Sequence, residues 1–166
     1  MKKRIAAPEL YTDRLKLVDM TEKDACFVVE CRSDPDVYKY FVSPHKITID
    51  EHLKWFRERY IYDENRFDWI AFSKEDEPIG VFGVKRDNEN MDTAEVSYIL
   101  SHDHYGKGYA SEAVNRLIIF CKDNWNCSKV IAEINKDNNA SIKFVEKLGF
   151  VAENNDASFI RYVREI

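Results

Sequence analysis

Two of the five glycines in this chain fall within one six-residue stretch, Tyr105-Gly106-Lys107-Gly108-Tyr109-Ala110. The stretch follows an apolar strand pattern, Thr93–Leu100, and precedes a helical pattern over about 107–124. Glycines at a helix start let successive backbone N–H groups point at an anion such as a pyrophosphate. The alternative is a tight strand-to-helix turn with no ligand. The stretch lacks the third glycine of a dinucleotide fingerprint and the ending of a P-loop, which disfavours both motifs.

Upstream of this turn, the sequence predicts a strand and two helices. A strand is expected over 9–20, where leucines alternate with charged residues. Two capping signatures each predict the start of a helix: Thr21 with Asp24, and Thr48 with Glu51. The first helix should run to about Arg32 and be closed by Pro35. The second carries three apolar residues at helical spacing, with Trp55 beside them: Leu53, Phe56 and Tyr60.

After these helices the apolar period changes from about 3.6 to 2. Three runs predict an antiparallel meander: Phe67–Ser73, Ile79–Lys85 and Thr93–Leu100. A helix over about 107–124, a strand over about 128–134, a helix over about 139–147 and two terminal strands follow. A strand-helix-strand crossover of this length requires a locally parallel pairing. We therefore expect a mixed α+β architecture, in which a twisted, mostly antiparallel sheet contains one βαβ unit, within a single domain over 1–166.

Composition and charge restrict the class of protein. A net charge of −5 argues against a nucleic-acid partner and against an anionic membrane surface, and mildly favours cationic substrates such as amines. No apolar run approaches the length of a membrane span. The cysteines lack metal-ligand spacing and are expected to be reduced thiols in a cytoplasmic protein with no metal site: Cys26, Cys31, Cys121 and Cys127.

At the glycine turn the chain resembles the GNAT acetyltransferase superfamily, whose acetyl-CoA motif reads Arg/Gln-x-x-Gly-x-Gly/Ala after a strand. Gly108 and Ala110 fill the last two positions, while Tyr105 stands where the pattern has Arg or Gln. That departure, and the opening run 10–17, resemble the ribosomal-protein N-terminal acetyltransferase-like branch. The resemblance implies a GNAT fold, direct acetyl transfer to a primary amine and acetyl-CoA as co-substrate. It assigns acetyl-CoA to these residues: Ile99, Leu100, Tyr105, Gly106, Lys107, Gly108, Tyr109, Ala110, Asn138, Ser141 and Phe144.

Two catalytic roles are assigned on the same resemblance. Ser141 is expected near the thioester sulfur as proton donor, because Val145 stands where many family members carry a tyrosine acid. The alternative is that Asn138 and Ser141 only cap a helix. Glu95, a charged residue within a strand pattern, is the candidate base for the acceptor ammonium. Two histidines next to the turn remain alternatives for the base: His102 and His104.

The acceptor is less well defined by the sequence. Four aromatic residues are candidates for binding it, with burial in the core as the alternative: Phe41, His52, Trp55 and Trp69. Three functions remain open: acetylation of a protein N-terminus; acetylation of a small amine such as a nucleotide-linked amino sugar or a polyamine; and acyl-CoA binding without turnover. A monomer or a homodimer is expected.

Overall fold

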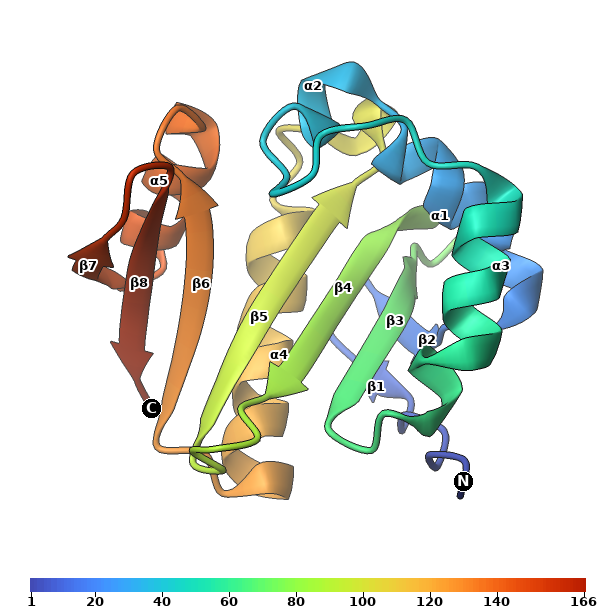
Figure 1. The fold of residues 1–166 in the computed structure, drawn as a ribbon, viewed down its shortest axis with the longest axis horizontal. Coiled ribbons are helices and arrows are strands. Elements are labelled where there is room, and N and C mark those ends of the chain that lie inside the picture. Colours follow the sequence, from blue (N-terminus) through green and yellow to red (C-terminus); the bar gives the residue numbers. More distant parts are fainter.

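The computed structural model describes residues 1–166 and is built on one eight-stranded sheet of order β1-β2-β3-β4-β5-β6-β8-β7 (Figure 1). The strands are β1 Leu10–Tyr11, β2 Lys16–Asp19, β3 Arg66–Phe72, β4 Pro78–Arg86, β5 Thr93–Leu100, β6 Lys129–Asn135, β7 Val151–Asn155 and β8 Phe159–Glu165. All neighbouring strands pair antiparallel except β5 and β6. The expected meander and βαβ unit are therefore confirmed.

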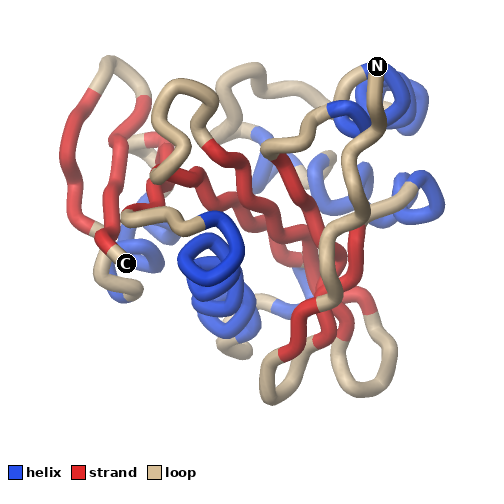
Figure 2. The backbone as a smooth tube through the Cα atoms, turned by 90° about the horizontal axis from the view of Figure 1, so that it is seen from below, coloured by secondary structure: helices blue, strands red, loops and turns tan.

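Helices cover both faces of the sheet (Figure 2). They are α1 Ala25–Arg32, α2 Pro35–Tyr38, α3 Ile49–Glu58, α4 Tyr109–Trp125 and α5 Asn139–Lys147, with short 3₁₀ turns at Glu22–Asp24, Tyr60–Tyr62 and His102–His104. No helix combines the length and the apolar character needed to cross a bilayer. All four cysteines have free thiols.

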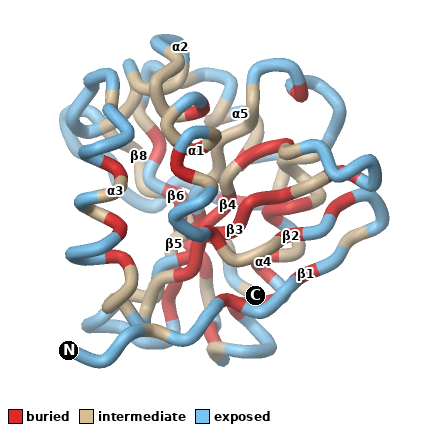
Figure 3. The backbone as a smooth tube through the Cα atoms, turned by 90° about the vertical axis from the view of Figure 1, so that its right-hand side faces the viewer, coloured by how far each residue is buried: buried red, intermediate tan, exposed pale blue.

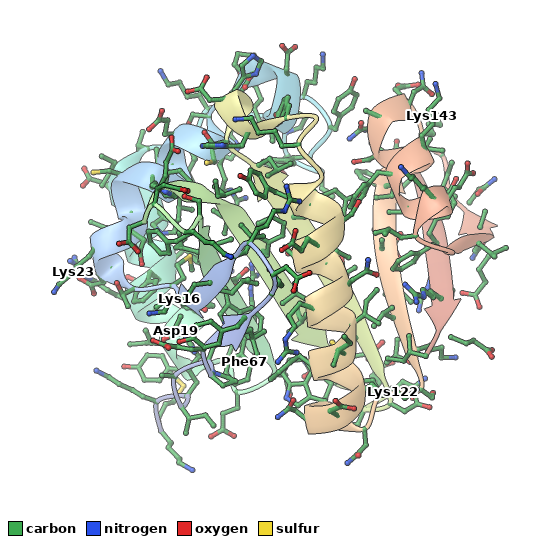
Figure 4. The ribbon with its side chains drawn as sticks, turned by 180° about the vertical axis from the view of Figure 1, so that it is seen from behind. Lys16, Asp19, Lys23, Phe67, Lys122 and Lys143 are labelled. Atoms are coloured by element: carbon green, nitrogen blue, oxygen red, sulfur yellow. The ribbon has the colours of Figure 1, made fainter.

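Two apolar clusters follow from the alternation of side chains along the strands. The larger lies between the sheet, α4 and α5 and includes Trp69, Phe82 and Leu117. The smaller lies on the opposite face, where Ile70 of β3 packs against Val28 of α1 and Phe56 of α3. Figure 3 shows the buried segments concentrated along the central strands. In the view of Figure 4, α4 runs along the sheet with Lys122 near one end, and Lys143 of α5 lies at the other end of the molecule.

One local prediction is wrong and another is incomplete. The expected strand over 9–20 is a hairpin of β1 and β2, because the chain reverses between Thr12 and Leu15, where the Thr12 N–H donates to the Leu15 carbonyl (2.9 Å). Pro35 does not only close the first helix; it begins α2, at a helical position where its missing N–H has no intrahelical partner to lose. The capping pair Thr48 and Glu51 opens α3 as predicted.

The sheet divides between β5 and β6. These two strands pair only from Thr93–Glu95 against Lys129–Ile131, although β5 continues to Leu100 and β6 to Asn135. Beyond Glu95 the strands diverge, as Figure 1 shows, and both chain segments that follow them begin at the open end. The turn before α4 and the start of α5 are thereby brought to the same end of the sheet.

Candidate active site

A cleft of about 1020 Å³ opens where β5 and β6 separate, and both halves of the predicted site line it. One end is bounded by the glycine turn, the start of α5 and the start of α2, the other by the end of α1, α3 and β3. The expected acetyl-CoA residues that line the cleft are Ile99, Leu100, Tyr105, Gly106, Gly108, Ala110, Asn138, Ser141 and Phe144. Lys107 and Tyr109 belong to the same turn, but they do not line the cleft.

The turn has the geometry of an anion cradle. Gly106 and Gly108 have φ of +74° and +79°, a conformation that favours glycine. No backbone or side-chain acceptor bonds the N–H groups of residues 106–111, and the first helical bond of α4 is donated by Glu112 to the Gly108 carbonyl. Successive free N–H groups at the positive end of a helix dipole suit a pyrophosphate such as that of coenzyme A.

The turn is fastened to the first hairpin by Arg14. Its Nε donates to Glu112 Oε2 (2.7 Å), its Nη1 donates to the Lys107 carbonyl (2.9 Å), and its guanidinium lies 4.5 Å from the Tyr109 ring centre. Glu112 also accepts from the Arg14 N–H and the Thr12 hydroxyl. Burial alone would raise the pKa of Glu112, but these hydrogen bonds outweigh it and lower the pKa. The clasp joins the two segments on which the branch resemblance rests.

The open edge of β5 presents particular backbone donors. Ser101 donates its N–H to the Ile79 carbonyl of β4, and the β4–β5 register has no irregularity. Because alternate residues of a strand direct their N–H groups to opposite sides, the N–H of Ile99 also faces β4. The N–H groups of Tyr98 and Leu100 face the separation from β6. Of the two predicted donors for the acetyl carbonyl, this geometry favours Leu100.

The start of α5 is capped as the simpler interpretation predicts, since Asn138 Oδ1 accepts from the Ser141 N–H (3.2 Å). A further residue appears here that the sequence did not single out. Tyr98 of β5 donates its hydroxyl hydrogen to Ser141 Oγ (3.2 Å) and packs against the Phe144 ring, with 4.7 Å between the ring centres. Burial raises the pKa of Tyr98 to about 12, so the phenol stays protonated at neutral pH. No sequence spacing links Tyr98 to Ser141, because separate elements carry them.

Glu95 is the last residue of β5 that pairs with β6, and it is half-buried in the cleft. Burial raises the pKa of Glu95, and the carboxylate of Glu133 on β6 raises it further. Three cations oppose this rise with smaller effects: Lys85, Arg66 and Arg161. A carboxylate with a raised pKa is a stronger base, as deprotonation of an ammonium requires.

The alternative bases are less well placed. His102 is exposed, with its ring 5.1 Å from that of Tyr105. His104 is buried with its Nε2 3.5 Å from Glu77 Oε1. Neither histidine lines the cleft.

At the other end of the cleft, three of the four predicted acceptor residues line the wall: Phe41, His52 and Trp55. Trp69 does not, and this prediction is wrong. Its neighbour Asp68 faces the cleft, so the period of two directs Trp69 to the opposite face of β3. There it is fully buried against Phe120 and donates its indole N–H to the Pro8 carbonyl (2.8 Å).

Charged residues that the sequence analysis did not select surround this end. Arg66 of β3 donates to Asp68 Oδ2 (2.7 Å) and lies 4.9 Å from the Trp55 ring centre. Arg32, the last residue of α1, lies 5.3 Å from the ring centre of Phe41. A cluster spread over α1, β3 and α3 leaves no local motif in the sequence.

Comparisons with known proteins agree with this geometry. Residues 14–151 match the family described as "Acetyltransferase (GNAT) domain". The uncharacterized N-acetyltransferase p20 of Bacillus licheniformis is 33% identical over 148 residues, covering 87% of this chain and 83% of that protein. The spermidine N-acetyltransferase of Vibrio cholerae, solved with CoA and spermine, superposes with a TM-score of 0.82 at 21% identity, covering 93% of this chain and 96% of the other. A domain from Methanocaldococcus jannaschii superposes with a TM-score of 0.79 at 26% identity, covering 93% and 100%.

The family match extends over most of the chain, and it contains the glycine turn, β5 and α5. The chain therefore belongs to the GNAT family and is an acetyl-CoA-dependent N-acetyltransferase.

Proposed function

We propose that the enzyme transfers the acetyl group directly from acetyl-CoA to a primary amine that lies beside Glu95. The observation that supports this is the position of Glu95 at the point where β5 and β6 separate. From there it shares one cleft with the glycine turn and with Ser141. Donor and acceptor therefore meet without a covalent intermediate on the protein.

In this proposal each group has one task. Glu95 takes the proton of the acceptor ammonium through a chain of water molecules, because about 16 Å of extended strand separates it from Leu100, and the amine nitrogen then attacks the acetyl carbon. The Leu100 N–H donates to the carbonyl oxygen, on which negative charge develops as the carbon–nitrogen bond forms. Ser141 donates to the sulfur as the carbon–sulfur bond breaks, and Tyr98 holds the Ser141 hydroxyl in place. The free N–H groups of the turn hold the pyrophosphate.

Two observations bear on the acceptor. The aromatic-Gly-Lys-Gly turn and the hairpin fastened to it support the ribosomal-protein N-terminal acetyltransferase-like branch, and hence a protein N-terminus. The fold shared with spermidine N-acetyltransferase supports a small amine such as a polyamine. A nucleotide-linked amino sugar is the other small amine to test.

The experiment is release of free CoA thiol from acetyl-CoA with three kinds of acceptor: short peptides with a free N-terminus, spermidine, and an amino-sugar nucleotide. We expect turnover with at least one, and a loss of about 10²-fold or more in kcat for Glu95→Gln with unchanged CoA affinity. Glu89→Gln, at an exposed carboxylate in the turn before β5, is the matched control. CoA binding without turnover on any acceptor would instead indicate an acyl-CoA-binding module.

A further inference from the structure

Arg32 carries a positive charge into the acceptor end of the cleft with no counter-ion. Its guanidinium forms no ion pair or hydrogen bond with the protein, and its Nε is buried without a partner. The remaining guanidinium nitrogens are not among the buried unpartnered atoms, and the residue lines the cleft, so they are open to a ligand. The carboxyl end of α1 favours a cation at this position, and folding therefore tolerates it there.

The groups around Arg32 do not neutralise it. Arg66 is already paired with Asp68 at 2.7 Å. Burial lowers the pKa of Arg32 and the charge of Arg66 lowers it further, while the Asp68 carboxylate, already paired with Arg66, opposes this with a smaller effect. Burial and then the charge of Arg32 lower the pKa of His52, with Asp68 opposing them, and the His52 Nε2 is buried without a partner. Phe41 offers only its ring face. Arg32 is therefore the cation of this corner that has no direct hydrogen-bonded or ion-paired partner.

The opposite wall is negative. A cavity of about 780 Å³ at this end is lined by Arg32 and Arg66 and by three carboxylates: Glu95, Glu133 and Asp156. Arg32 and Glu95 line this cavity from different elements, Arg32 from the end of α1 and Glu95 from β5. The cavity thus offers a carboxylate to an ammonium and, apart from it, a guanidinium to an anion.

We propose that the acceptor is an amine that carries an anionic group, a phosphate or a carboxylate, and that Arg32 binds this group while the amine lies at Glu95. The inference rests on the proposed function and narrows its acceptor. Arginine presents a fork of N–H donors that fits both kinds of anion. A polyamine brings a second ammonium and no anion, which leaves Arg32 unpaired in a partly buried site. In this proposal the chain shares the fold of spermidine N-acetyltransferase but acts on a different kind of amine.

The test uses pairs of acceptors that differ only in the anion. These are phosphoethanolamine with ethanolamine, glucosamine 6-phosphate with glucosamine, and two peptides that differ by Asp or Asn at their second residue; spermidine is the polycation. Thiol release gives kcat/KM for each with the native enzyme, Arg32→Met and the control Lys54→Met, which removes an exposed cation of α3 outside the cleft. Arg32→Gln replaces Arg32→Met if that variant does not fold.

We expect the native enzyme to have a kcat/KM about ten- to hundredfold higher for the anionic member of at least one pair. This is the effect that a charge-assisted hydrogen bond to the anion should have on acceptor binding. The pair that responds distinguishes a small phosphorylated amine from an acidic peptide. Arg32→Met should abolish the preference and leave the neutral acceptor within about twofold, whereas Lys54→Met should retain it. Spermidine as the best acceptor, or an equal loss for both members of each pair in Arg32→Met, would overturn the inference while leaving acetyl transfer intact. No thiol release from any acceptor would refute the proposed function itself.

Discussion

Arg14→Ala removes the clasp on the glycine turn and should weaken acetyl-CoA binding from outside the cleft. The variant loses two hydrogen bonds, to Glu112 Oε2 and to the Lys107 carbonyl, and the contact with the Tyr109 ring. An exposed ion pair contributes about 0–1 kcal/mol and an exposed cation–π contact about 0.5–1 kcal/mol. Because the Arg14 side chain is 45% exposed, we expect a total loss of about 1–2 kcal/mol.

For a domain of this size each kcal/mol corresponds to about 2–4 °C, so the melting temperature should fall by roughly 2–8 °C. If the ligand must then order the turn itself, its dissociation constant should rise by roughly five- to thirtyfold. Thermal denaturation measures the first effect and isothermal titration with CoA the second. The effect on kcat at saturating acetyl-CoA should be small.

Lys122→Ala is the matched control, since it removes a cation from α4 at the end remote from the turn (Figure 4). It should leave CoA affinity unchanged. Glu112→Gln should reproduce part of the effect of Arg14→Ala, because it weakens only the Arg14–Glu112 contact. The double variant should bind CoA little more weakly than Arg14→Ala alone. A lower melting temperature with native CoA affinity would refute the reasoning, because the clasp would then stabilise the fold without shaping the cradle.

Four further predictions concern the site. Glu95→Gln should keep or raise the melting temperature at neutral pH. The pKa of Glu95 is higher in the folded than in the unfolded protein, so its ionisation at neutral pH destabilises the folded state; a clear drop in melting temperature by calorimetry would contradict this. Glu133→Gln removes a charge that raises the pKa of Glu95, so the acidic limb of the kcat/KM–pH profile should move to lower pH; movement to higher pH would argue against Glu95 as the base. Ser141→Ala and Tyr98→Phe should each slow turnover at saturating acetyl-CoA by up to about 10²-fold, and the double variant should be little slower than either single variant. If the two losses in rate multiply in the double variant, the two hydroxyl groups act independently and the proposed pairing is wrong. Gly108→Ala places a side chain at φ +79° at a cost of about 1–2 kcal/mol and should raise the KM for acetyl-CoA; an unchanged KM would contradict the cradle.

The sheet and its helices were largely predictable, because periodicity and capping are local. Thr93–Leu100 has the same bounds in the pattern and in β5, and the helix expected over 139–147 is α5. The hairpin of β1 and β2 was missed because Leu15 and Leu17 continue the alternation across the reversal. That reversal depends on a hydrogen bond between Thr12 and Leu15, which the spacing of apolar residues does not reveal.

In the candidate site, too, features set by one short segment were predictable and those that join distant segments were not. The glycine turn was predictable because one short segment sets its backbone geometry. Tyr98 was missed because its partner Ser141 lies on another element, and pattern alone does not give side-chain pairs across a sheet. Trp69 was misassigned because an aromatic residue on a strand is compatible with either face until the neighbouring Asp68 is seen in the cleft.

The difference between the residues that were predicted and those that were missed bears on the specificity of the enzyme. The donor half of the cleft is formed mainly by backbone N–H groups, which need glycines and a helix start and little else. The part of the cleft that we assign to the acceptor is formed by side chains from α1, β3 and β5, so a single substitution such as Arg32→Met is enough to change its charge. We therefore expect proteins with the same turn to share a co-substrate and to differ in their acceptors. For this chain the unpaired guanidinium of Arg32 is more informative about the acceptor than the spermidine activity of a protein that shares its fold at 21% identity.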